Sequence, residues 1–391
     1  MKSVKAVTLK LLEYSNINDW AGYDPYDALN SRIFEFAPFL NFRIPRLVIT
    51  QLLKRCPVNF RPLLLIPKTH NPKALALFLM SLIKLSKLGL LDQEDLIAKL
   101  IDKLVVHRSK DSFYWCWGYS FPWQTRTIIV PRGTPNLVCT VFVANALLDA
   151  YEFNQEQRCF NMAASAAAYI LDELYWTEGN TTASFSYPLP SSRTPVYNAN
   201  FLAAALLCRI YKYSGEAKFI NAALKVARYS AAKQHEDGSW DYGESPKQRW
   251  VDNFHTGYNL CALRFICQYI ETSEFDPCIR RGFEFYRNHF FREDGVPGYF
   301  HDRTYPIDIH SVAQSIITLL TLKDLDEGNA SKLAYSVFTW SMSHLWDKKG
   351  FFYYQELPLY RIKIPYIRWS EAWMLIALAT LLEKCDQGVS G

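Results

Sequence analysis

Six similar helix starts recur along the chain at a nearly constant spacing, and this repeat restricts the fold more than any other feature of the sequence. Five of the starts carry a proline, which fixes φ in a first helical turn without the loss of a hydrogen bond: Pro72, Pro135, Pro195, Pro306 and Pro365. With residue 251 taken as the fourth start, the intervals are 63, 60, 56, 55 and 59 residues. A period near 60 residues predicts an array of one repeated helical unit.

Each of the first five starts introduces two helices rather than one. The first is rich in alanine and leucine and apolar on most sides, as in "TPVYNANFLAAALLCRIY" (194–211). After a polar break such as "SGEAK", a second helix follows with one apolar and one polar face, as in "FINAALKVARYSAAKQ". The contrast predicts an inner ring of helices that is buried on most sides and an outer ring with one face in water.

The sixth inner helix has to borrow its outer partner from the other end of the chain. It ends near residue 382, which leaves only nine residues, so we expect residues 43–55 to supply the partner. Six helical hairpins closed in this way form an all-α (α/α)6 toroid; an open helical solenoid has the same period and is the alternative. No Pro/Gly/Ser-rich linker divides the chain. We therefore expect residues 46–391 to form a single toroid domain and residues 1–45 an irregular segment packed on it.

Composition excludes several classes of protein. Hydrophobic residues make up 50% and charged residues 21% of the chain, as in ordinary globular proteins. The net charge of +5 arises from 43 basic and 38 acidic residues without a contiguous basic block, so no nucleic-acid partner is expected. No apolar run approaches the ~20 residues of a membrane span, and the first residues do not resemble a signal peptide. The nine cysteines form no CxxC pair. We expect free, buried thiols and a cytoplasmic location.

Parallel inner helices would bring all six helix starts to one end of the toroid. Their unpaired N–H groups and helix dipoles would then point into a common funnel, which favours an anionic or oxygen-rich ligand. Polar side chains recur at this level of the helices. They are Asn136, Asn198, Asn200, Asp252, Asn253, His255, Asp308, His310, Arg368 and Glu371.

Two interpretations of the acidic residues among them are open. Asp252 and Asp308 could cap helices by accepting backbone N–H groups. His255 and His310, however, follow them by three and two residues on neighbouring inner helices, and a histidine beside a carboxylate suits acid/base chemistry. We therefore take Asp252, His255, Asp308, His310 and Glu371 as candidate catalytic residues. Arg368 could pair with Glu371 at i,i+3 or clamp an anionic ligand with two hydrogen bonds.

Aromatic residues, 15% of the chain, gather in the loops that precede the helix starts. They suit stacking on sugar rings or enclosing an apolar ligand, and loops also use them simply for packing. Besides the asparagines and Arg368 above, the candidate binding residues are Trp117, Trp123, Arg126, Trp240, Tyr242, Tyr258, Tyr299, His301, Tyr354 and Trp369. No P-loop, GxGxxG, GxSxG or HExxH motif is present, and no Cys/His set suits zinc. We expect neither a cofactor nor a metal.

The turn "QHEDGSWDYGE" (234–244), together with the period near 60 residues, resembles the α/α-toroid superfamily of carbohydrate-active and terpenoid enzymes. Gln234, Asp237, Gly238 and Trp240 match one copy of the Q-x-x-D-G-x-W turn of squalene-cyclase and protein-prenyltransferase relatives. The sequence has no DxDD-type proton donor like that of those cyclases, and it lacks the zinc-binding Asp, Cys and His set of the transferases. A terpenoid enzyme is therefore kept as an alternative.

The second branch that the sequence resembles contains glycan enzymes: unsaturated glucuronyl hydrolases, N-acylglucosamine epimerases, uronate epimerases and polysaccharide lyases. The chain is also similar to helical-toroid proteins that accompany bacterial polysaccharide biosynthesis, with "WGYSFPWQTR" and "TPNLVCTVFVANALLDAYE" as distinctive strings. This resemblance implies sugar stacking on Trp and Tyr, proton transfer by His, Asp or Glu, and binding of uronate carboxylates by Arg or Asn. We expect an enzyme that acts on a uronate- or amino-sugar-containing glycan by hydrolysis, elimination or epimerisation. A non-catalytic glycan-binding protein is the alternative.

Overall fold

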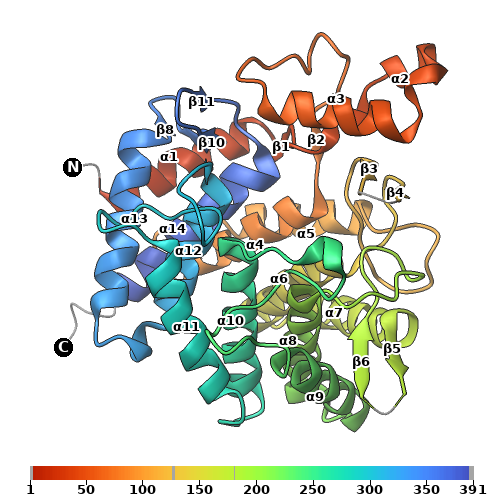
Figure 1. Ribbon diagram of the computed structural model, residues 1–391, viewed down its shortest axis with the longest axis vertical. Coiled ribbons are helices and arrows are strands. Elements are labelled where there is room, and N and C mark those ends of the chain that lie inside the picture. Colours follow the sequence, from red (N-terminus) through yellow and green to blue (C-terminus); the bar gives the residue numbers. More distant parts are fainter. Residues whose placement is uncertain (1–2, 126–127, 180, 387–391) are drawn as a thin grey trace.

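The inner helices form a closed ring in the computed structural model, which describes residues 3–125, 128–179 and 181–386. Each inner helix contacts the next one along the chain, and the last contacts the first. Figure 1 shows this arrangement. The inner helices are α4 (Pro72–Lys87), α6 (Leu137–Asn154), α8 (Tyr197–Ser214), α10 (Asn253–Tyr269), α12 (Ile309–Thr321) and α14 (Ala372–Asp386). The contact between α14 and α4 confirms the predicted toroid and excludes the open solenoid.

An outer helix packs on each inner helix. These helices are α1 (Val4–Ile17), α5 (Glu94–Val106), α7 (Gln157–Tyr169), α9 (Ala217–Ala231), α11 (Asp276–Phe290) and α13 (Asn329–His344). Within every hairpin but the last, the outer helix follows its inner partner. The two rings therefore have the predicted order.

The partner of α14 differs from the prediction. It is α1, which buries Val7 and Leu11 completely, rather than residues 43–55. Those residues form a separate helix, α3 (Arg43–Arg55), which packs on a short 3₁₀ turn at Asp27–Asn30. The prediction that residues 1–45 form an irregular segment was thus wrong for its first part, because α1 is a helix of the outer ring. Figure 1 shows α3 and the short helix α2 (Ile33–Phe36) outside both rings.

Capping side chains set where the inner helices begin. Asn71, Asn136, Asp252 and Asp308 each accept a hydrogen bond from a backbone N–H two or three residues further on, which satisfies donors that the first turn leaves unpaired. The first five helices therefore begin at or up to three residues after the predicted starts. The sixth is an exception, since a π-helical turn at Ile367–Glu371 precedes α14.

Short antiparallel strands connect the loops between the helices. The pairs are β1 (Ala21–Gly22) with β2 (Thr69–His70), β3 (Trp123–Gln124) with β4 (Ile129–Val130), β5 (Tyr175–Glu178) with β6 (Thr182–Phe185), and β8 (Trp346–Asp347) with β9 (Phe351–Phe352). A three-stranded sheet joins β7 (Ile307–Asp308), β10 (Gln355–Glu356) and β11 (Arg361–Ile362). A single bridge between Asp252 and Phe300 attaches a loop to the start of α10. The strands thus hold loops beside helix starts and form no layer of their own.

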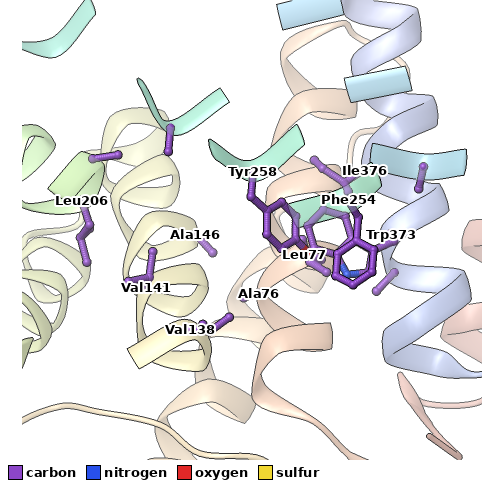
Figure 2. Packing of buried hydrophobic residues seen from close by; sticks show 14 of the residues in the cluster. Ala76, Leu77, Val138, Val141, Ala146, Leu206, Phe254, Tyr258, Trp373 and Ile376 are labelled. Atoms are coloured by element: carbon purple, nitrogen blue, oxygen red, sulfur yellow. The ribbon is translucent and has the colours of Figure 1, made fainter. Parts of the chain in front are cut away.

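Aromatic rings fill the middle of the inner ring. Tyr258 of α10 stacks on Trp373 of α14, with ring centroids 5.5 Å apart, and Phe142 of α6 meets Trp373 edge-on at 5.3 Å. Figure 2 shows Tyr258, Phe254 and Trp373 grouped beside Leu77 of α4. The helices α6 and α8 contribute small buried residues such as Ala146 and Ala204, which allow the helices to approach closely. These aromatic side chains separate the space inside the inner helices into one part at each end of the toroid.

Two further expectations concern cysteines and membrane spans. The eight cysteines whose side chains the structure describes are free thiols, and all except Cys56 are buried, as predicted. Across the described ranges, no helix combines the length and the apolar character needed to cross a bilayer.

The placement of α1 can be tested by truncating a side chain that it buries. We expect Leu11→Ala to lower the free energy of unfolding by about 2–5 kcal/mol, because the change removes apolar contacts and leaves a cavity against the inner ring. Ile17→Ala on the same helix is the matched control, since Ile17 is 75% exposed. Urea-unfolding curves measure both variants, and equal stability of the two would contradict the packing of α1 in the outer ring.

Candidate functional site

A cavity of about 500 Å³ opens at the end of the toroid where the inner helices begin. Every inner helix contributes a residue from its first turn or from the turn that leads into it, as the parallel arrangement predicts. These residues are Lys73, Val138, Asn198, His255, His310 and Arg368. The volume is that of a site for a small molecule or a short oligomer. Six helix N-termini around one cavity also give it a positive potential.

Ten of the residues proposed from the sequence line this cavity. They are Trp123, Asn198, Tyr242, Asp252, His255, Tyr258, Tyr299, His310, Arg368 and Trp369. Nine others lie outside its lining: Trp117, Asn136, Asn200, Trp240, Asn253, His301, Asp308, Tyr354 and Glu371. Arg126 falls outside the described residues.

Several of the nine have structural partners that account for them. Asn200 accepts hydrogen bonds from Ser184 Oγ and the Phe185 N–H and donates to Ser230 Oγ. Asn253 accepts one from Tyr286 Oη at 2.8 Å. Four others are used in a similar way. Trp117 Nε1 donates to the Leu104 carbonyl and Trp240 Nε1 to the Ser230 carbonyl, Asn136 caps α6, and His301 Nδ1 lies 3.3 Å from the Val251 carbonyl. These side chains hold loops and helices rather than the cavity.

Asp252 caps α10 and orients a histidine at the same time. Its Oδ1 accepts the backbone N–H of His255 at 3.0 Å, and its Oδ2 lies 2.7 Å from His255 Nδ1. Trp250 Nε1 donates to the same Oδ2 at 2.9 Å. Because a carboxylate only accepts hydrogen bonds, this contact places the imidazole proton on Nδ1 and leaves the lone pair on Nε2. The two interpretations of Asp252, cap and part of a site, are therefore compatible.

His310 is enclosed by aromatic rings. Phe254 and Trp373 stack on it with centroids 4.5 Å away on each side, and its Nε2 shares a hydrogen bond of 2.6 Å with Tyr258 Oη. Within the described part of the chain, its Nδ1 has no hydrogen-bond partner. Burial, followed by the Lys73 and Arg368 cations, lowers the pKa of His310 well below its usual value. His310 is therefore neutral at physiological pH, with one ring nitrogen unused.

Asp308 lies behind the cavity wall rather than in it. Its carboxylate caps α12 through the His310 backbone N–H at 2.8 Å and accepts Trp369 Nε1 at 2.8 Å and Gln355 Nε2 at 2.5 Å. Burial raises the pKa of this carboxyl. The hydrogen bonds position two residues that do line the cavity, and they make Asp308 a support for the site.

Arg368 lines the cavity but does not pair with Glu371, which was one of the two interpretations open from the sequence. Its guanidinium makes two hydrogen bonds, of 2.6 and 2.8 Å, to the carboxylate of Asp24 in the amino-terminal segment. Glu371 is buried elsewhere, and its Oε2 accepts the Phe352 N–H at 3.0 Å. Both residues belong to the π-helical turn, but they bind different partners: Arg368 binds Asp24 and Glu371 binds the Phe352 N–H. Of the two interpretations, the i,i+3 pair with Glu371 is thus absent, and a long-range ion pair with Asp24 takes its place.

Lys73 is the most unusual residue of the cavity, and the sequence analysis missed it. Its side chain is buried, and its Nζ lies over the rings of Phe142, Trp373 and Tyr258, at 4.2, 5.1 and 5.5 Å from their centroids. No carboxylate of the described residues forms an ion pair with it. Burial, followed by the Arg368 cation, lowers the pKa of the ammonium well below its usual value. A lysine directly after Pro72, at the head of an otherwise apolar helix, was the available signal.

Aromatic side chains form most of the remaining wall. Tyr242 and Trp250 stack with centroids 4.5 Å apart and planes at 12°, and the pair lies beside His255. The lining residues that the sequence analysis did not single out are Tyr26, Lys73, Tyr119, Phe121, Val138, Tyr187, Trp250, Phe254, Phe300 and Arg303. Four of them, Tyr119, Phe121, Tyr187 and Phe300, come from loops whose sequence was recognised as aromatic-rich, but only the fold shows which rings face the cavity.

A second cavity, of about 670 Å³, lies at the opposite end of the ring. Several of its charged groups already have partners: Arg209 binds Asp149 and Glu152, and Lys84 binds Glu383. It is larger than the first cavity, but it lacks the helix N-termini and the histidines. Among the described residues, no group of three or more His, Cys, Asp or Glu side chains is arranged to hold a metal ion. We therefore take the first cavity as the candidate site.

The buried carboxyl of Glu371 gives a pH-dependent prediction. Burial raises its pKa well above the usual value, so the native state holds this proton more firmly than the unfolded chain, and ionisation destabilises the native state as pH rises above about 4.3. Glutamine cannot ionise. We expect Glu371→Gln to match the wild type near pH 4 and to exceed it increasingly in free energy of unfolding toward pH 8.

Urea unfolding at a series of pH values measures this difference. Glu236→Gln, at an exposed position, is the control and should show no such gain. A constant difference between Glu371→Gln and the wild type across the pH range would refute the buried-carboxyl interpretation.

Comparison with known proteins places this geometry in a structural context. Neither a protein-family model nor a curated protein matches the sequence. Among solved structures, the chain is similar to an unsaturated glucuronyl hydrolase specific for heparin, with a TM-score of 0.60, 13% identity, and coverage of 98% of each chain. It is also similar to the cellobiose 2-epimerase from Spirochaeta thermophila (TM-score 0.58, 15% identity, 81% of this chain and 87% of that one).

A third similar structure is the glycoside hydrolase family 76 α-mannanase from Bacteroides thetaiotaomicron, with a TM-score of 0.59, 11% identity, and coverage of 82% of this chain and 87% of that one. At these identities the likeness concerns the fold. The chain has the six-hairpin (α/α)6 toroid that these carbohydrate-active enzymes share.

Proposed function

We propose that the protein is a carbohydrate-active enzyme that transfers a proton to and from a uronate-containing glycan in the cavity at the helix starts. The observation that carries the proposal is the combination of an oriented histidine with buried cations. His255 is held by Asp252 at 2.7 Å, and Lys73 and Arg368 line the same cavity. The similar structures are a glucuronyl hydrolase, an epimerase and a mannanase, and they support a saccharide as the substrate class.

The charge of the cavity favours an anionic sugar over one with a free amine. Lys73 has no ion-pair partner among the described residues, and six helix N-termini add positive potential. A carboxylate in the cavity would raise the depressed pKa of Lys73 and pair with its ammonium, which offsets the cost of burying that group. A protonated amine would find no free carboxylate oxygen in the described lining, because both oxygens of Asp252 already accept hydrogen bonds.

The arrangement supports removal of a proton from the carbon next to the uronate carboxylate. His255 Nε2, whose lone pair is free because Nδ1 carries the proton, accepts that proton. Negative charge then develops on the oxygens of the uronate carboxylate, and Lys73 and Arg368 stabilise it. In an elimination, the bond to the neighbouring glycosidic oxygen breaks, a carbon–carbon double bond forms, and the hydrogen-bonded pair of Tyr258 and His310 protonates the departing oxygen. In an epimerisation, the proton returns on the opposite face.

Two-carboxylate hydrolysis fits this cavity less well. It needs a pair of Asp or Glu residues, one as acid and one as base or nucleophile, about 5–9.5 Å apart across the scissile bond. Of the described residues, Asp252 is the one carboxylate in the lining, and both of its oxygens already accept hydrogen bonds. Asp308 and Glu371 lie outside the lining. We therefore favour elimination or epimerisation over hydrolysis. We also favour them over a terpenoid reaction, because basic side chains such as Lys73 and Arg368 in the lining do not suit such a reaction.

The first test separates helix capping from chemistry at Asp252. We expect Asp252→Asn and His255→Ala each to lower turnover of a uronate oligosaccharide by roughly 10²–10⁴-fold. Asparagine keeps the oxygen that caps the helix but replaces the oxygen that accepts Trp250 Nε1 and contacts His255 Nδ1, so Asp252→Asn should still fold, with a lower melting temperature. Absorbance of a new double bond reports elimination, and deuterium uptake from D2O next to the carboxylate reports epimerisation.

Glu371→Gln serves as the matched control, because that carboxyl is buried but lies outside the cavity lining. It should keep the turnover of the wild type. Unchanged turnover in both Asp252→Asn and His255→Ala would exclude the proposed base. Binding of the oligosaccharide without any turnover by the wild type would instead leave a non-catalytic glycan-binding protein.

A second test concerns the choice of an anionic sugar. We expect Lys73→Met to weaken binding of a uronate oligosaccharide by about tenfold to a hundredfold, because a charge-assisted hydrogen bond is lost. Methionine retains the length of the side chain among the aromatic rings and removes a costly buried charge, so stability should hold or rise. Calorimetric titration with a uronate oligosaccharide and a neutral one of equal length measures the effect. Equal weakening for both sugars would contradict a carboxylate contact at Lys73.

A further inference from the structure

The segment from residue 36 to residue 65, which contains α3, exposes an unusual number of large apolar side chains. It holds ten of the nineteen large hydrophobic residues that are exposed in the described part of the chain. They are Phe36, Phe39, Phe42, Ile44, Val48, Leu52, Val58, Phe60, Leu63 and Leu65, with exposed fractions from 43% to 78%. We call these ten side chains the apolar flap. Contiguous exposed apolar surface of this kind marks an interaction site in soluble proteins.

Helix α3 shows why this surface is not an ordinary solvent face. Thr50 and Leu53 point toward the rest of the protein and are buried. On the opposite side, Ile44, Val48 and Leu52 follow one another at intervals of four residues, so they form one stripe along the helix. They are 72%, 49% and 65% exposed. A helix with a second apolar stripe directed at water lacks the partner that would cover it.

Charge identifies the kind of partner. Residues 32–68 contain seven basic residues and one acidic residue, although the whole chain has a net charge of only +5. The excess was not apparent from the sequence because the basic residues are spaced out rather than contiguous. Arg61 is buried and pairs with Asp27, but Arg32, Arg55 and Lys68 are exposed around the apolar flap. Two copies of this face would repel each other, whereas an anionic surface would attract it.

We propose that the apolar flap and its surrounding basic residues dock the protein on an anionic lipid bilayer, as a helix that lies in the membrane interface. Apolar side chains on one face and arginine or lysine beside them are the features of such helices. Long basic side chains such as Arg55 can bury their methylene groups while the charged end reaches the headgroups. The protein needs no membrane-spanning helix for this mode of binding.

The docking surface lies beside the mouth of the candidate site. Lys54 of α3 donates a hydrogen bond of 2.7 Å to Tyr26 Oη, and Tyr26 lines the cavity. The helix also packs on β3, whose Trp123 lines the cavity as well. A bilayer bound at the flap would therefore hold the cavity mouth near the lipid headgroups. The proposal itself does not depend on which reaction the cavity supports.

Co-sedimentation with lipid vesicles tests the proposal on the full chain. We expect binding to vesicles of phosphatidylglycerol and phosphatidylcholine in equal parts, little binding to phosphatidylcholine alone, and weaker binding as salt increases. The triple variant Ile44→Ser, Val48→Ser, Leu52→Ser should bind about tenfold more weakly or worse. The pair Arg32→Glu, Arg55→Glu should lose the preference for the anionic vesicles.

Matched controls use exposed positions elsewhere. Val106→Ser, Phe113→Ser, Leu359→Ser removes three side chains that are 68%, 94% and 94% exposed, and Lys332→Glu, Lys349→Glu reverses two exposed charges. Both should bind vesicles as the wild type does. Absence of binding to anionic vesicles would overturn the proposal, as would equal losses in the control variants. A dimer in solution that the triple variant abolishes, without vesicle binding by the wild type, would instead assign the flap to a second copy of the chain.

Discussion

The fold depends on the contact between the two ends of the chain at the last inner helix. In a toroid built from sequential hairpins, the sixth inner helix has no following helix to cover it, and an uncovered apolar helix is unstable in water. Here α1 supplies that cover, and the segment after it is fastened by the buried ion pair of Asp24 with Arg368 and by the hydrogen bond from the Ile367 N–H to the Tyr23 carbonyl. Breaking a buried pair of this kind leaves an uncompensated charge. Because Arg368 also lines the cavity, the same ion pair closes the toroid and holds part of the cavity wall.

Helix capping and site chemistry turn out to use the same groups. The start of an inner helix needs an acceptor for its free N–H groups, and in a toroid all these starts surround one cavity. A carboxylate placed there as a cap can turn its second oxygen toward a side chain one turn further on, as Asp252 does toward His255. Asp308 differs, because its second oxygen accepts a hydrogen bond from Gln355 Nε2 and does not contact the His310 ring. That ring forms its hydrogen bond with Tyr258 Oη. The neighbouring groups decide which cap becomes part of a site.

Local signals made the architecture predictable. Proline, capping residues and alternating apolar and amphipathic helices act within a few residues, and they located the first five helix starts to within three residues. The choice between α1 and α3 as the closing helix was not local, because both are short helices with apolar residues, and only packing shows that Leu11 is buried while Ile44 is exposed. The same limit applies to the site. His255 and Asp252 are three residues apart and were recognised, whereas Asp24 lies 344 residues from Arg368 and no sequence pattern joins them.

The features that break the ordinary rules of stable folding lie on one side of the molecule. Among the described residues, no carboxylate pairs with the buried Lys73 and no group bonds His310 Nδ1. The ten side chains of the apolar flap face water. Each costs stability in the isolated protein. Costs of this kind persist where a ligand or a surface removes them, so proteins tend to concentrate them at functional sites. The cavity and the flap meet through Tyr26 and Lys54. An anionic glycan would pair with Lys73 and His310, and an anionic bilayer would cover the apolar flap. Both ligands are anionic, so this end of the toroid is suited to negatively charged partners.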